Sequence, residues 1–135
     1  MNAWTPALAT GVAQIDEQHQ NIFQWLAELE SATGDKRTLL GVYAITRLKQ
    51  FIREHFAQEE KLMRAASYPG LAEHMAEHAA FRAKLGELQQ HSIGHDISQE
   101  TVDFLKAWVT EHISKTDMAY VPYLNKAKAV PTQAD

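Results

Sequence analysis

The segment from Leu71 to Phe81, LAEHMAEHAAF, carries two histidines four residues apart. Four residues are about one turn of an α-helix, so His74 and His78 would lie on one face and could reach one metal ion. The zinc-protease motif has the same histidine spacing, but it requires glutamate directly after the first histidine, and Met75 stands there. The pair therefore indicates a metal site of another kind.

Histidine also interrupts the apolar stripe of every other predicted helix, as His19, His55 and His112, and Glu59 follows His55 by one turn. A single histidine in such a stripe is most often a hydrogen-bonded core residue. Five of them with a carboxylate are harder to explain in that way, because burying polar groups without partners costs several kcal/mol each. The pattern predicts that they converge on a metal site.

The ligand types narrow the choice of metal. Nitrogen and carboxylate oxygen without sulfur suit iron, manganese or zinc, whereas calcium and magnesium prefer oxygen alone. The chain has no cysteine, which excludes disulfides, iron–sulfur clusters and thiolate zinc sites. Five histidines exceed what one ion usually takes from a protein, so we expect two ions.

Asp117 is a further candidate ligand, but its spacing is awkward. It follows His112 by five residues, which is about 500° of rotation in a regular α-helix and turns it some 140° away. The helix must therefore end or distort after His112 if both residues are to reach one site. A solvated surface carboxylate is the alternative interpretation.

The elements that would position these residues are all helices. Apolar spacing predicts a first helix over Asp16–Ser31 with Asp16 as N-cap, a second from about Lys36 to Ala66, a third from Leu71 through Leu88, and a fourth through Val102 and His112. Long amphipathic helices with short connections predict an all-α fold, an up-down-up-down antiparallel four-helix bundle.

Both ends of the chain are expected to be less regular. An irregular N-terminal arm containing Pro6 and Gly11 precedes the first helix, and Pro122 should interrupt a short last helical segment near Tyr120–Lys128. We predict one domain over residues 1–128 and a disordered tail over residues 129–135.

Composition limits the partners. The net charge of −4, from 13 Lys+Arg and 17 Asp+Glu, argues against binding to nucleic acid or to an anionic membrane surface. No apolar run approaches the roughly 20 residues of a membrane span, and the N-terminus lacks the features of a signal peptide. We expect a soluble cytoplasmic protein and a monomer.

Four segments together resemble the hemerythrins, in particular the single-domain bacteriohemerythrins. They are IDEQH (15–19), HFAQEEKLM (55–63), YPGLAEHMAEHAAF (68–81) and WVTEHISKTDMAY (108–120), in the family's order and spacing. The resemblance implies a non-haem di-iron centre with an oxo or hydroxo bridge. One iron would be held by His74, His78 and His112, the other by His19 and His55, and Glu59 and Asp117 would bridge them.

The resemblance also implies reversible dioxygen binding, because the second iron keeps one open position. The family's apolar dioxygen pocket corresponds here to Ile22, Phe56, Trp108, Val109 and Ile113, with valine at 109 where leucine is commoner; ordinary core packing is the alternative role for these five. Transport, storage or buffering of dioxygen is the leading function, and not catalysis. The alternatives are a di-iron enzyme (peroxidase, oxidase or nitric oxide scavenger), a sensor acting through a separate partner, and a structural zinc bundle.

Overall fold

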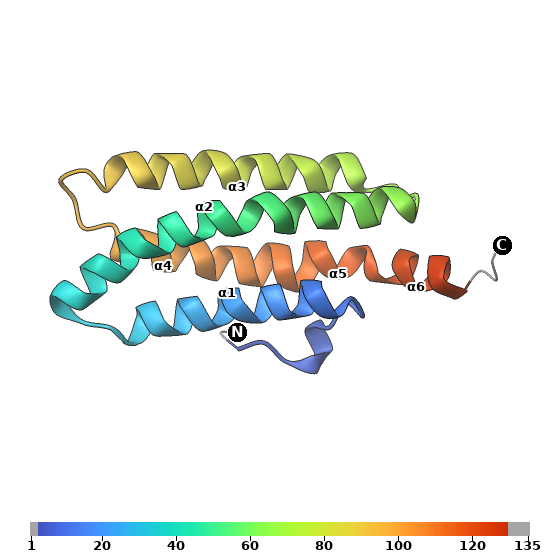
Figure 1. Ribbon diagram of the computed structural model, residues 1–135, viewed down its shortest axis with the longest axis horizontal. Helices are drawn as coiled ribbons and strands as arrows, with labels where there is room; N and C mark the ends of the chain where they lie inside the picture. Colours follow the sequence, from blue (N-terminus) through green and yellow to red (C-terminus); the bar gives the residue numbers. More distant parts are fainter. Residues whose placement is uncertain (1–2, 130–135) are drawn as a thin grey trace.

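The computed structural model describes residues 3–129. Four long helical segments run along one axis in alternating directions, and the N-terminal arm lies beside α1 (Figure 1). The elements are η1 (Pro6–Leu8), α1 (Ala13–Ser31), α2 (Gly34–Ala65), α3 (Leu71–His91), α4 (Ser98–Ala107), the π-helix η2 (Trp108–Thr116), α5 (Asp117–Ala119) and α6 (Val121–Ala129). Across residues 3–129 there is no strand. The predicted antiparallel four-helix bundle is confirmed.

The apolar stripes meet in two unequal clusters. The larger contains residues of all four long segments, such as Ile22, Leu48, Leu85 and Leu105. The smaller consists of Met63, Tyr120 and Leu124, close to the end of α2 and the start of α6. Along α2, Glu59 lies between Phe56 of the larger cluster and Met63 of the smaller. The predicted metal ligands therefore occupy a polar layer enclosed by apolar packing on both sides.

The predicted N-cap at Asp16 is wrong. Helix α1 begins three residues earlier, at Ala13, and Asp16 lies in its first turn. Its Oδ1 atom accepts hydrogen bonds from the backbone nitrogen of Thr10 (2.7 Å) and from Thr10 Oγ1 (2.8 Å). The carboxylate thus fastens the N-terminal arm to α1, at the end of the helix where the dipole favours negative charge.

The last helix also departs from the sequence prediction, whereas the end of α2 agrees with it. Helix α2 ends at Ala65, within one residue of the predicted end. The left-handed residue Ser67 (φ 54°) follows, and the backbone N–H of its neighbour Tyr68 donates to the carbonyl of Met63 (3.0 Å). Pro122 does not interrupt the last helix, because the break falls at Tyr120 and α6 then begins with Pro122 in its first turn. A proline costs little there because the first turn needs no internal N–H donor.

The domain boundary at residue 128 stays a prediction. Helix α6 extends to Ala129, and the rest of the predicted tail lies outside the described residues. Within residues 3–129 no helix is both long and apolar enough to cross a membrane.

Candidate metal centre

The four long helical segments bring all seven predicted ligands into one buried layer. Helix α1 supplies one, α2 two, α3 two, and η2 and α5 one each. Every one of these side chains is at most 2% exposed: His19, His55, Glu59, His74, His78, His112 and Asp117. Residues almost 100 positions apart in the sequence are therefore neighbours, as the antiparallel topology requires.

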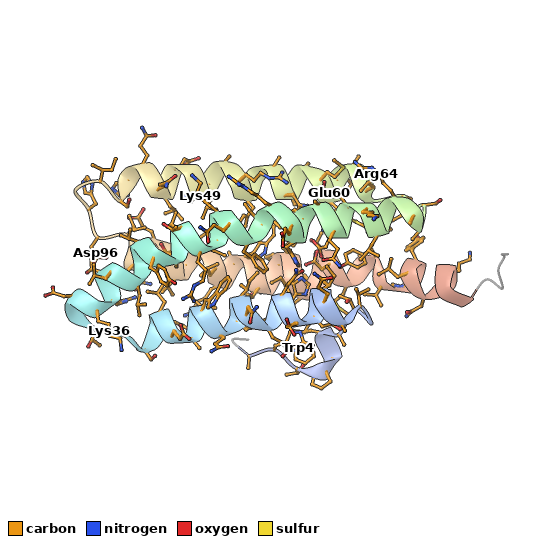
Figure 2. All side chains as sticks on the ribbon, viewed as in Figure 1. Trp4, Lys36, Lys49, Glu60, Arg64 and Asp96 are labelled. Atoms are coloured by element: carbon orange, nitrogen blue, oxygen red, sulfur yellow. The ribbon has the colours of Figure 1, made fainter. Side chains whose placement is uncertain are left out.

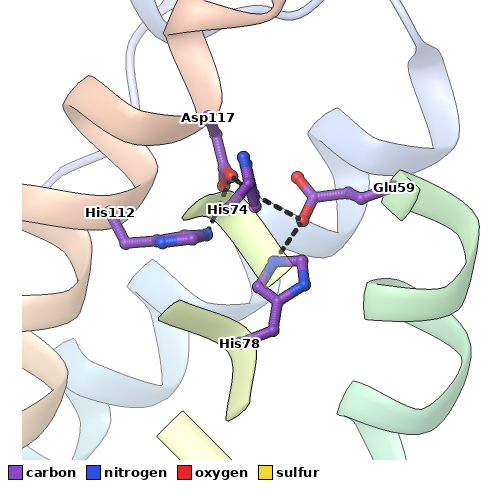
Figure 3. A group of neighbouring side chains, drawn as sticks. All are labelled: Glu59, His74, His78, His112 and Asp117. Atoms are coloured by element: carbon purple, nitrogen blue, oxygen red, sulfur yellow. Dashed lines mark ion pairs between the residues drawn. The ribbon is translucent and has the colours of Figure 1, made fainter. Parts of the chain in front are cut away.

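Their ligand atoms form two overlapping groups, each lying within 4.8 Å. One group contains His74, His78 and His112, the other His19 and His55, and both contain Glu59 and Asp117. The side with three histidines and the two shared carboxylates is drawn in Figure 3. The grouping is thus unequal, three histidines against two, around a common pair of carboxylates.

The shortest distances between a histidine Nε2 atom and a carboxylate oxygen in the layer are those of Asp117 Oδ1. Its Oδ1 atom lies 2.9 Å from the Nε2 atoms of both His74 and His112, and its Oδ2 atom lies 3.1 Å from His19 Nε2. Glu59 Oε1 lies 3.1 Å from His78 Nε2 and 3.6 Å from His55 Nε2. Each carboxylate therefore faces histidines of both groups.

These short distances are not hydrogen bonds. His19, His74, His78 and His112, together with both carboxylates, carry buried nitrogen or oxygen atoms that have no hydrogen-bond partner in the described structure. Metal–ligand bonds of about 2.1 Å at right angles place neighbouring ligand atoms about 3 Å apart. These ligand atoms lie close together without hydrogen-bond geometry. This is the arrangement expected of side chains that bind a common cation.

The electrostatics of the layer fit the same role. Burial and the charge of Asp117 both raise the pKa of Glu59, but the facing His74 and His78 outweigh them and lower it to about 2. Burial likewise raises the pKa of Asp117, yet the charge of His112 and the other facing imidazoles hold it well below its ordinary value. Both carboxylates are therefore ionised at neutral pH, the form that binds metal.

A distortion in the fourth long helical segment, which consists of α4, η2 and α5, explains how Asp117 reaches the same layer as His112. The backbone from Trp108 to Thr116 is a π-helix, and the Asp117 N–H donates to the carbonyl of His112, five residues earlier. Bonding from residue i to i+5 widens the turn, which brings residues five apart back toward the same face of the helix. The predicted distortion after His112 is confirmed, and it places both side chains in the buried layer.

Sequence reasoning missed the residues that hold the far side of the histidine rings. The Nδ1 atoms of three histidines are paired with oxygen acceptors on the preceding helix: His55 with Gln18 Oε1 (2.6 Å), His78 with Glu60 Oε2 (2.8 Å) and His112 with Glu77 Oε1 (2.8 Å). Each acceptor precedes or follows a predicted ligand in the sequence, which is the signal that could have found it.

These partners fix the histidine tautomers. A carboxylate or amide oxygen can only accept, so each Nδ1 carries the proton and each Nε2 presents a lone pair to the buried layer. Metal-bound histidines usually donate their second ring N–H in this way. Each of these hydrogen bonds joins two consecutive long helices of the bundle: one helix carries the acceptor and the next carries the histidine that donates to it.

Tyr120 plays a similar part for a carboxylate. It is fully buried, and its hydroxyl donates to Glu59 Oε2 over 2.8 Å. Burial, with the charges of Glu59 and Asp117, raises the pKa of Tyr120 far above its usual value, so the hydroxyl keeps its proton. The bond leaves Glu59 Oε1 to face the histidines.

We expect Tyr120→Phe to fold but to hold metal more weakly. Phenylalanine keeps the ring that packs on Met63 and Leu124 and removes only the donor to Glu59. Loss of such an outer contact typically weakens metal binding by about 10- to 100-fold. Metal release to a chelator measures the change, and Tyr123→Phe on the exposed side of α6 is the matched control. Equal release rates in the two variants would contradict the role of the hydroxyl.

The five predicted pocket residues differ in exposure, and two of them, Phe56 and Trp108, stack on ligand histidines. Ile22, Phe56, Val109 and Ile113 are at most 1% exposed. Phe56 stacks on His78, with ring centroids 3.7 Å apart and planes within 3°. Trp108 stacks on His112 in a similar way (3.7 Å, 11°), but it is only partly buried. Its outer face lines an open apolar groove of about 340 Å³ between α3 and the fourth helical segment.

Comparison with known proteins places the chain in a family. Residues 10–124 match the family described as the hemerythrin HHE cation binding domain. This chain belongs to the hemerythrin family. The match runs from the Thr10 contact with α1 to Leu124 of the smaller apolar cluster, so it includes the complete buried layer.

Individual hemerythrins resemble the chain over most of its length. A bacteriohemerythrin of Stenotrophomonas maltophilia is 35% identical over 119 residues, 87% of this chain and 77% of that protein. One from Methylococcus capsulatus is 33% identical, covering 90% of this chain and 95% of that protein. A crystal structure of a hemerythrin mutant superposes with a TM-score of 0.74 at 31% identity, over 90% of this chain and 95% of the other.

Proposed function

We propose that this hemerythrin binds dioxygen reversibly at a non-haem di-iron centre, as a carrier, store or buffer. The observation that carries the proposal is the unequal pair of ligand groups, which share Glu59 and Asp117 but hold three and two histidines. His74, His78 and His112 would bind one iron, and His19 and His55 the other. A bound iron pair would supply the electrons for reversible dioxygen binding.

The inequality gives the two sides different tasks. With three imidazoles and two shared carboxylates, one side is nearly filled by protein ligands. The side of His19 and His55 has one histidine fewer, which leaves room for an external ligand. Imidazole and carboxylate suit iron, and the absence of cysteine removes thiolates from the choice.

The surrounding residues favour binding over catalysis. Reversible binding requires that no nearby group delivers protons to the bound ligand. Ile22, Phe56, Val109 and Ile113 offer no titratable group, and they are at most 1% exposed. The hydroxyl of Tyr120 donates a hydrogen bond to Glu59, and its pKa is raised, so it keeps its proton. The apolar wall therefore supports storage of the ligand without further chemistry.

The absorption spectrum tests the proposal. Anaerobically reduced protein is exposed to oxygen and then purged with argon, and iron is counted in the same sample. Two irons per chain, with visible bands that appear with oxygen and disappear on purging, are expected. Irreversible bands with steady peroxide consumption in the presence of an electron donor would favour the enzyme alternative. A sample that binds no iron would contradict the proposal.

Val109→Leu should slow autoxidation of the oxygen-bound protein. Val109 is fully buried in the larger apolar cluster and precedes His112 by three residues, and the added methylene would reduce the space open to water there. The expected result is a slower loss of the oxygen-bound form than in the parent protein. The decay of the oxygen-dependent bands measures it, with Val42→Leu on the exposed surface as control. An unchanged rate would show that the volume at position 109 does not limit the reaction.

A further inference from the structure

Two histidines remain outside the buried layer, at the opposite end of α3. His91 is the last residue of α3, and His95 lies in the connection to α4. His91 follows His78 by 13 residues, which is about 20 Å along a helix axis. The connection containing His95 and Asp96 projects from the end of the bundle (Figures 1 and 2). These histidines therefore belong to a separate place in the fold.

We propose that His91 and His95 form a surface site for a divalent transition cation of the zinc, copper and nickel class. Their ring centroids are 4.3 Å apart. In the buried layer, the histidine pairs within one ligand group have centroids 4.6, 4.7, 5.1 and 5.0 Å apart. The surface pair is thus at least as close as pairs whose Nε2 atoms face a common point.

The hydrogen bonds of the two rings support the same use. His91 Nδ1 lies 3.1 Å from Glu100 Oε2, and His95 Nδ1 lies 3.2 Å from the backbone carbonyl of His91. A carboxylate and a carbonyl accept but do not donate, so both Nδ1 atoms carry protons, and in the neutral form of each ring Nε2 keeps the lone pair. A carboxylate or carbonyl on the second nitrogen is the usual setting of a metal-bound histidine.

The chemistry of the pair decides the class of ligand. Two neutral imidazoles suit zinc, copper and nickel, whereas calcium and magnesium require oxygen. Asp96 already accepts hydrogen bonds from the Ser98 backbone N–H at Oδ1 and from Thr38 Oγ1 at Oδ2, so we assign the two imidazoles as the protein ligands. Water would complete the shell, since His91 is 44% exposed. Such a site would fasten the connection between α3 and α4 to the end of α3.

Zinc binding to the iron-loaded protein tests the inference. Equilibrium dialysis against zinc alone, with zinc and iron counted together, should show one zinc per chain and an unchanged iron content. His91→Gln with His95→Gln should abolish that zinc. Glu100→Gln should weaken zinc binding by about tenfold or more, because it replaces the carboxylate that accepts from His91 Nδ1. Glu87→Gln, one turn before His91 on α3, is the control that removes the same charge.

Thermal unfolding gives a second readout. A cation that binds only the folded state raises its stability with concentration, so zinc should raise the unfolding temperature of the parent protein and not that of the double glutamine variant. Bound zinc that survives in the double variant, or that appears only as iron is lost, would overturn the inference. So would the absence of any bound zinc. None of these outcomes depends on what the buried layer does with dioxygen.

Discussion

Glu59→Ala should remove both irons, the largest effect expected of any single change in this chain. Glu59 belongs to both ligand groups, is completely buried, and lies within 3.8 Å of four histidines. Alanine leaves those imidazoles and the Tyr120 hydroxyl facing a cavity, and Asp117 becomes the one carboxylate of the two ligand groups that can balance the charge of two cations. We therefore expect less than one iron per chain after dialysis, counted by elemental analysis.

Two further variants sharpen this result. His78→Ala removes a member of only one ligand group, so it should cost one iron more readily than two. Glu54→Ala is the matched control. It makes the same glutamate-to-alanine change at an exposed position of the same helix, outside the buried layer. Two irons and normal oxygen bands in Glu59→Ala or His78→Ala would show that the ligand assignment is wrong.

Removing iron from the parent protein should lower its free energy of unfolding by several kcal/mol. A buried polar atom left without a partner costs about 1–3 kcal/mol, and several such atoms lie on four histidines and both carboxylates. Domains of this kind have only about 5–15 kcal/mol in total. Urea unfolding of loaded, stripped and reloaded protein measures the loss. Equal midpoints for loaded and stripped protein would contradict a structural contribution of the metal.

The size of that loss should depend on pH. In the metal-free protein, burial lowers the pKa of His74, but Asp117 and Glu59 outweigh it and raise the value to about 9. A pKa raised above its unfolded value stabilises the fold below about pH 6.5 and loses that contribution as pH rises through about 9. The difference between loaded and stripped protein should therefore widen over this interval. A constant difference would show that His74 does not pair with the carboxylates once iron is gone.

The sequence by itself determined the bundle and where its polar layer would lie. Apolar residues at helical spacing marked the inward faces, and histidines in those faces marked the exceptions, because a buried imidazole needs a partner. His74 and His78 could be placed on one face from their spacing alone. The unequal division of the histidines came from the resemblance to hemerythrins, and the fold then brought the same residues together.

Only the tertiary structure decided the details that depend on contacts between helices. The spacing of His112 and Asp117 demanded a distortion, but a π-helix was not predictable from residue types, since its cost is met by the packing around it. Gln18, Glu60 and Glu77 each stand next to a predicted ligand in the sequence, but which histidine of the next helix each one pairs with depends on how the helices pack. The hydrogen bonds from Thr10 of the N-terminal arm to Asp16, and the close approach of His91 and His95, also depend on the tertiary structure. Local periodicity fixes which face of a helix turns inward, whereas the partner across that face depends on how the helices dock.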